Sequence, residues 1–160
     1  MPEQPNVGSD VVANVHYGGD YKGQLVQAAT TGQCIFCGPR FQRENALHRV
    51  ANVSEMVSWL IFHNNYPMKD RQDGHPEFQL LLMSEEHRDD TQPLSGVDWA
   101  LITFLVETCK KELGIKGGCY FFRDGDPTIS GRTVRHTHVH YVVPRIGEDG
   151  KPIPIDIPAG

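Results

Sequence analysis

Three histidines alternate with other residues near the C-terminal end of the chain, at His136, His138 and His140. Side chains alternate between the two faces of a β-strand, so this spacing predicts a strand over Thr133–Val143 with all three imidazole rings on one face. Three neighbouring titratable rings are unusual in a hydrophobic core, which favours a functional site. Two kinds of site remain open: a face that chelates a metal ion, and a phosphate site in which one ring is a nucleophile.

Hydrophobic periodicity predicts one long helix and several strands upstream of the histidines. Ser95 is suited to cap the start of the helix, apolar residues recur at helical spacing after it, and Gly114 is placed to end it. β-Branched and aromatic runs predict four further strands, at Leu47–Val53, Met56–His63, Phe78–Met83 and Gly118–Arg123. A strand-rich pattern with one principal helix indicates a single α+β domain.

The two ends of the chain differ in composition from the region between them. Residues 1–30 are polar and rich in glycine, which predicts an N-terminal extension with weak intrinsic order. Residues 146–160 form a proline-rich tail, expected as an edge strand or an extended arm, and residues 31–145 form the domain itself. We expect no secretory signal, because no apolar run of the kind such a signal needs follows the first residues, and no apolar stretch approaches the roughly 20 residues of a membrane span. We therefore expect a cytoplasmic protein with no membrane partner.

The charge balance argues against one class of partner. Lys and Arg number 15 and Asp and Glu number 20, which gives a net charge of −5. An acidic protein is poorly suited to charge-driven binding of polymeric nucleic acid. Four arginines nevertheless lie close to the histidines in sequence, at Arg123, Arg132, Arg135 and Arg145. The sequence thus predicts a locally basic pocket and a small ligand.

Cys34 and Cys37 have the C-x₂-C spacing of a metal-binding pair. A closed tetrahedral zinc site needs two more ligands, which this spacing does not identify. A redox dithiol is the alternative, but such a pair usually opens a helix after a buried strand, whereas Ala29–Gln33 are mostly polar. The other two cysteines, Cys109 on the predicted helix and Cys119 in a predicted strand, are expected in the core.

Further motifs accompany the three histidines along the chain. Residues 136–143 fit the pattern His-φ-His-φ-His-φ-φ, where φ is apolar, except at Thr137. Five other motifs lie upstream, at Cys34–Cys37 (Cys-Ile-Phe-Cys), Phe62–Pro67, Leu80–His87, Gly125–Pro127 and Gly131–His136. Over about residues 34 to 145 the chain therefore resembles the histidine-triad (HIT) superfamily of nucleotidyl hydrolases and transferases, in its zinc-containing Cys-x-x-Cys branch.

The resemblance implies a role for each residue of the site. His138 would be the nucleophile that attacks an α-phosphorus and forms a nucleotidyl-histidine, and His140 would donate to a non-bridging oxygen. Asn64 would hold the ribose. The phosphate or leaving group would be met by Gly131, Arg132 and Thr133, with Arg132 in place of the family's usual Gln. The zinc ligands would be Cys34, Cys37, His87 and His136.

The resemblance also implies a fold and an activity. The fold would be an antiparallel HIT-like sheet with one long helix, in a homodimer. The reaction would be hydrolysis at the α-phosphate of a substituted nucleoside phosphate, such as a dinucleoside polyphosphate or a nucleoside phosphoramidate. Gly-His precedes the apolar strand in many members, and here either Gly74-His75 or Gln79 could take that place.

Three other functions remain open. A phosphorylase or nucleotidyl transferase would pass the nucleotidyl group to phosphate or a sugar phosphate instead of water. A non-catalytic, zinc-stabilised module would bind a nucleotide or a protein. A metal-centred oxygenase would use all three histidines as ligands, but it would leave the cysteine pair and Asn64 unexplained.

Overall fold

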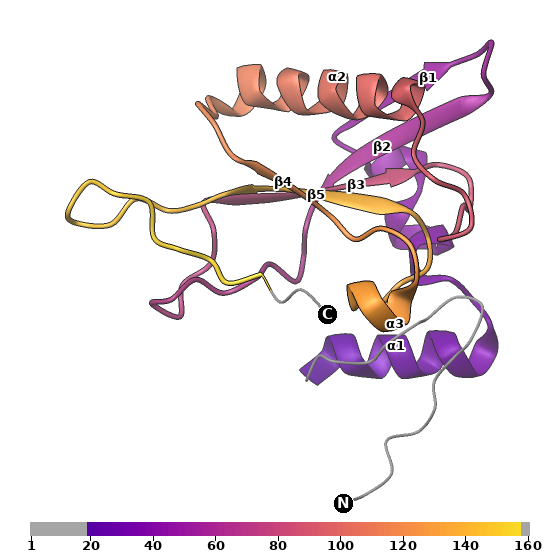
Figure 1. Cartoon of the computed structure of the whole chain (residues 1–160), viewed down its shortest axis with the longest axis horizontal. Coiled ribbons are helices and arrows are strands. Elements are labelled where there is room, and N and C mark those ends of the chain that lie inside the picture. The colour runs from indigo at the N-terminus through magenta and orange to yellow at the C-terminus, as the bar shows by residue number, and fades with distance from the viewer. Residues whose placement is uncertain (1–18, 158–160) are drawn as a thin grey trace, which may run out of the picture.

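A computed structural model describes residues 19–157, which form an α+β fold around one antiparallel sheet (Figure 1). The sheet has five strands in the order β1-β2-β3-β5-β4. The strands are His48–Asn52 (β1), Val57–His63 (β2), Phe78–Ser84 (β3), Cys119–Phe122 (β4) and His138–Val143 (β5). The helices are Gly19–Thr31 (α1), Gly96–Leu113 (α2) and Pro127–Ser130 (α3), and three 3₁₀ turns, Ile35–Cys37 (η1), Pro39–Phe41 (η2) and Arg43–Asn45 (η3), separate α1 from β1. The expected α+β class with one long helix is confirmed.

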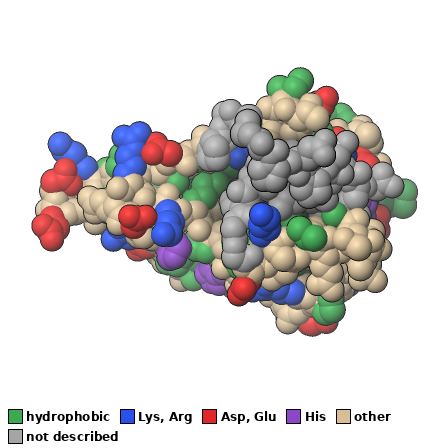
Figure 2. Space-filling model, turned by 90° about the horizontal axis from the view of Figure 1, so that it is seen from below, with side chains coloured by type: hydrophobic (Ala, Val, Ile, Leu, Met, Phe, Trp, Pro, Cys, Tyr) green, Lys and Arg blue, Asp and Glu red, His purple; other side chains and the backbone are tan. Residues whose placement is uncertain are grey.

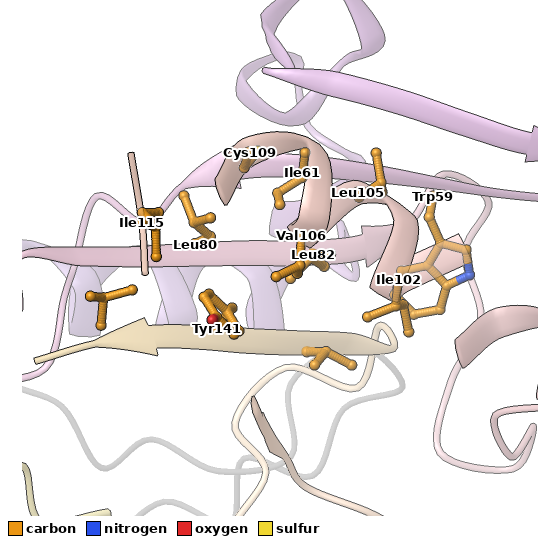
Figure 3. Packing of buried hydrophobic residues seen from close by; sticks show 12 residues of the cluster. Trp59, Ile61, Leu80, Leu82, Ile102, Leu105, Val106, Cys109, Ile115 and Tyr141 are labelled. Carbon is orange, nitrogen blue, oxygen red and sulfur yellow. The ribbon is translucent and has the colours of Figure 1, made fainter. Parts of the chain in front are cut away.

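The long helix α2 covers one face of the sheet (Figure 1). Its start is fixed by a capping box, in which Ser95 accepts from the N–H of Asp98 and the Asp98 carboxylate accepts from the N–H of Ser95. Gly114 ends the helix in a left-handed conformation with φ of 68°. The main core lies between this helix and the sheet (Figure 3) and includes Trp59, Ile61, Leu80, Leu82, Ile102, Leu105, Val106, Val139 and Tyr141.

Helix α1 lies on the opposite side of the sheet from α2 (Figure 1). Leu25 and Ala28 lie three residues apart, on one stripe of the helix, and both are buried. A second core joins them to Cys34, Phe36, Leu60, Phe62, Leu81, Met83 and Val134. Packing of this stripe against the sheet accounts for the helix in a segment that is expected to have weak order by itself. The other residues of the expected extension, 1–18, lie outside the described residues.

The strand that carries the histidines begins later than the predicted Thr133–Val143. Regular pairing starts at His138, since the N–H of Thr137 donates to the carbonyl of Arg88, in the loop after β3, at 2.6 Å. Strand β5 lies between β3 and β4, and side chains on its two faces have different surroundings. Val139 and Tyr141 enter the α2 core, whereas the two histidines of β5 lie on the α1 side.

Cys109 is buried in the α2 core, as expected. Cys119 lies in a strand, as expected, but it is exposed and the core prediction is wrong. Its strand, β4, is at the edge of the sheet, with a neighbour on one side only among the described strands. None of the described helices is long and apolar enough to cross a membrane.

The tail after Pro144 packs beside the loop between β2 and β3. Arg145 donates to the buried carboxylate of Asp70 at 2.7 Å, and Arg71 pairs with Asp156 at 2.7 Å. A Cβ atom at Gly74 would clash with the guanidinium as Arg145 is placed here, so a side chain there would require Arg145 to move. The described part of the tail first turns back on itself, with an antiparallel bridge between Ile146 and Pro152, and then continues without regular structure beside the loop.

Candidate functional site

Two cysteines and two histidines from distant parts of the chain converge beside the sheet. Cys34 precedes the turn η1 and Cys37 ends it, and the N–H of Cys37 donates to the carbonyl of Cys34 at 3.1 Å. His87 lies in the loop after β3, and His136 lies just before β5. One ligand atom from each residue lies within 4.8 Å of all the others. These four residues, called the metal cluster below, could hold a metal ion.

The distances within the metal cluster fit a tetrahedral site. Nδ1 of His136 lies 3.5 Å from the Sγ atoms of Cys34 and Cys37, and Nδ1 of His87 lies 3.4 Å from Sγ of Cys37. Metal–sulfur and metal–nitrogen bonds of a tetrahedral zinc site would separate such ligands by about 3.5 Å. Burial, and then the charge of Cys37, raises the pKa of Cys34 to about 12. A cation would offset both effects and stabilise the thiolate.

The ring of His136 is oriented by Ser84, the last residue of β3. Its Nε2 lies 2.7 Å from the Ser84 carbonyl, which can only accept a hydrogen bond, so Nε2 carries the proton and Nδ1 presents a lone pair to the thiols. Burial lowers the pKa of His136 to about 4, so the ring is neutral at pH 7. Both features suit a metal ligand, since metal-binding histidines usually donate their other N–H to an acceptor.

His138 opens β5 and lies directly beside the metal cluster. Its Nδ1 donates to the main-chain carbonyl of His136 at 2.7 Å, so its Nε2 carries the lone pair. The ring packs nearly perpendicular to the ring of Phe36, with 5.0 Å between ring centroids. Burial, and then the neighbouring His140, holds the pKa of His138 well below its ordinary value. The ring is thus neutral and nucleophilic at Nε2.

A cavity of about 510 Å³ opens on the α1 side of the sheet and is lined by both histidines of β5. Figure 2 shows this side of the molecule. Charged side chains are frequent at the left end of the view, and histidine and hydrophobic side chains lie next to them. Aromatic side chains dominate one part of the lining: Tyr21, Phe36, Phe41, Tyr66 and Phe121. Polar side chains also face the cavity: Asn64, Gln79, Arg123 and Thr133. A large, partly aromatic cavity with a few converging polar groups is typical of a small-molecule site.

The cavity brings together some of the expected phosphate-site residues and leaves out others. His138, His140, Asn64 and Thr133 line it. Gly131 and Arg132 do not, and Arg132 is buried elsewhere. Its guanidinium donates from Nε to the carbonyl of Arg123 at 3.1 Å and lies over the ring of Phe122. Of the four arginines that lie close to the histidines in sequence, Arg123 lines the cavity, and its guanidinium lies over the ring of Phe121.

Helix α1 supplies part of the cavity wall, which sequence reasoning missed. Gln24 donates from Nε2 to the hydroxyl of Tyr66 at 2.6 Å, and the rings of Tyr21 and Tyr66 lie 4.8 Å apart. Arg40 lies near the Tyr66 ring and also lines the cavity. The spacing of Tyr21, Leu25 and Ala28 along one helical stripe was the available signal for a packed helix.

No family model matches the chain, and no curated protein matches it.

Proposed function

We propose that the chain is a nucleotide hydrolase of the histidine-triad kind, which acts at the α-phosphate of a substituted nucleoside phosphate. The observation that carries the proposal is the state of His138. Its Nδ1 is engaged by a main-chain carbonyl, its Nε2 carries the lone pair, and the ring lines a cavity large enough for a nucleotide. An imidazole held in this way is ready to attack phosphorus without first losing a proton.

The reaction would proceed in two displacements at phosphorus. In the first, Nε2 of His138 bonds to the α-phosphorus while the bond from phosphorus to the leaving group breaks. In the second, water attacks the same phosphorus, the phosphorus–nitrogen bond breaks and its electron pair returns to Nε2. The proton of the attacking water passes to solvent, and the leaving group gains a proton overall. His140 and Thr133 also line the cavity and would donate to the charged oxygens.

The lining of the cavity supports a nucleoside substrate. Aromatic rings such as Phe41 and Tyr66 can stack on a base, and Asn64 can hydrogen-bond to a ribose. Arg123 and Lys69 supply positive charge for phosphate groups. The substrate would be a dinucleoside polyphosphate or a nucleoside phosphoramidate.

The proposal assigns zinc to the metal cluster, in a structural role. Two thiolates and two imidazoles complete a tetrahedral set, which is typical of a closed zinc site. The ion would hold the His136 segment against η1, and the carbonyl of that same residue orients His138. The cluster thus supports the nucleophile while leaving its Nε2 unbound.

The proposal includes the homodimer that the resemblance implies. Strand β4 is at one edge of the sheet, and two large hydrophobic side chains that contact each other there are exposed, Trp99 of α2 and Tyr120 of β4. An exposed edge and an apolar patch are common features of surfaces that pair.

The test uses His138→Ala, with His48→Ala as the matched control. His48 pairs with Glu112 away from the cavity lining, so its loss should leave turnover unchanged. We expect His138→Ala to lower the kcat for adenosine phosphoramidate and for a diadenosine polyphosphate by on the order of 10⁴-fold or more. Its zinc content and circular dichroism should match the wild type. A brief substrate pulse should give a nucleotidyl adduct by intact mass in the wild type alone.

Full turnover by His138→Ala would refute the assignment of His138 as the nucleophile. Nucleotide binding without turnover in the wild type would favour the non-catalytic module instead. Transfer of the nucleotidyl group to added phosphate in place of water would favour the phosphorylase or transferase.

A further inference from the structure

The last of the three histidines, His140, has a side-chain partner within the cavity wall. Its Nδ1 lies 3.2 Å from Nε2 of Gln79, a buried residue of β3. On its other side the ring stacks on Phe121, with 5.8 Å between centroids and 27° between the planes. The position of the ring is therefore fixed by two neighbouring strands.

A main-chain group fixes the orientation of the Gln79 amide. The N–H of Met68 donates to Oε1 of Gln79 at 2.8 Å. The reverse orientation of the amide would point its NH₂ group at that N–H, so that two donors would face each other. The NH₂ group of Gln79 must therefore point toward His140.

This orientation determines the tautomer of His140. An amide NH₂ can only donate, so Nδ1 of the ring accepts and carries no proton. Burial, and then the charge of Arg123, lowers the pKa of His140 to about 4, so the ring holds a single proton at pH 7. That proton is on Nε2.

The two histidines of β5 thus have opposite tautomers. A carbonyl, which only accepts, holds the proton of His138 on Nδ1, whereas an amide NH₂, which only donates, holds the proton of His140 on Nε2. One ring presents a lone pair at Nε2, and the other presents an N–H at the corresponding atom. Attack on phosphorus needs the first and stabilisation of its charged oxygens needs the second.

We propose that Gln79 is a positioning residue, which keeps His140 as the Nε2–H tautomer so that this ring donates to the phosphate under attack. The inference rests on the proposed function for the role of the donor, but not for the tautomer itself. The tautomer can be measured without any substrate.

The first experiment reads the tautomer by long-range ¹H–¹⁵N NMR on protein labelled at histidine, with His140 assigned from the spectrum of His140→Ala. In the wild type we expect a protonated Nε2 and an unprotonated Nδ1. In Gln79→Glu the carboxylate can still accept from the N–H of Met68, but it faces Nδ1 with an acceptor. The Nδ1 signal of His140 should then shift to the protonated range. Gln92→Glu, an exposed change of the same kind, should leave the signal unchanged.

The second experiment uses Gln79→Met, which keeps the length of the side chain but removes its hydrogen bonds. We expect kcat to fall by up to about 10²-fold, because the His140 donor is no longer fixed. In a His140→Ala background the same change should have no further effect. A merely structural role for Gln79 would lower kcat to the same extent in both backgrounds and would overturn the proposal.

The two experiments distinguish a failure of this inference from a failure of the proposed function. A proton on Nδ1 of His140 in the wild type would overturn the inference, but it would not affect the assignment of His138 as the nucleophile. The expected tautomer in a protein that turns over no nucleotide would overturn the proposed function and leave the action of Gln79 on the tautomer in place.

Discussion

Replacement of Asp98 by Asn removes the charge from a carboxylate that joins helix α2 to the candidate site. Asp98 is almost fully buried and accepts from Nε1 of Trp59 at 2.9 Å and from Nη1 of Arg88 at 2.6 Å. The carbonyl of Arg88 in turn accepts from the N–H of Thr137, between the first two histidines. Loss of the charge should therefore destabilise both the helix start and the segment beside the metal cluster.

The magnitude follows from the pKa of the carboxyl. Burial alone would raise this pKa, but hydrogen bonds from Arg88, Ser95 and Trp59 lower it from 3.8 to about 2. That difference corresponds to about 2 kcal/mol of stability at pH 7. The Arg88 guanidinium is only partly buried, so water can offset part of its lost pairing in Asp98→Asn and about 2 kcal/mol is the expected loss. The charge-dependent part is complete above pH 3.8 and is lost as the pH falls toward the folded-state pKa.

The assay is urea unfolding of the wild type and Asp98→Asn, followed by circular dichroism at pH 7 and pH 3. We expect the free energy of unfolding to differ by about 2 kcal/mol at pH 7 and by about 1 kcal/mol less at pH 3. Asp73→Asn, at an exposed carboxylate, is the control and should change little. A difference that does not depend on pH, or one no larger than that of Asp73→Asn, would refute the argument.

Two further predictions concern the metal and the assembly. Metal analysis should find one zinc per chain. The variant Cys37→Ser should lose the zinc together with several kcal/mol of unfolding free energy, whereas Cys119→Ser should keep it. A Cys37→Ser protein as stable as the wild type would exclude a structural metal. Light scattering should give a mass of roughly twice 17.9 kDa, that of a dimer. The change Tyr120→Lys on the β4 edge should shift the measured mass toward that of the monomer. A wild-type protein that is monomeric at all concentrations would contradict the dimer.

The sequence predicted the elements that follow strong local patterns. The caps at Ser95 and Gly114 and the apolar periodicity between them located α2, and runs of β-branched, aromatic and other apolar residues located β2 and β3. The metal cluster was expected in a different way: the C-x₂-C spacing indicated only Cys34 and Cys37, and His87 and His136 were implied by the resemblance to the histidine-triad superfamily.

Other features depend on contacts between distant segments, which local patterns do not contain. The apolar stripe on α1 is short and lies in a polar stretch, so its spacing is a weak signal until its packing against the sheet is known. Arg132 and Arg123 are equally basic in the sequence, but only the fold determines that the first is buried under main-chain carbonyls and the second reaches the cavity. The orientation of the Gln79 amide likewise requires the position of Met68.

The order of the strands has a consequence for how the chain reaches this structure. Strand β5 is the last in sequence, yet it inserts between β3 and β4, so β4 has no partner among the described strands until β5 arrives. Cys34 and His136, which meet in the metal cluster, are 102 residues apart. Closing so long a loop has an entropic cost that comes before the contacts across the loop can form. A chain that ended before residue 136 would have neither a complete sheet nor a complete set of metal ligands. Binding of the metal would therefore indicate that the segment leading into β5 has reached its place.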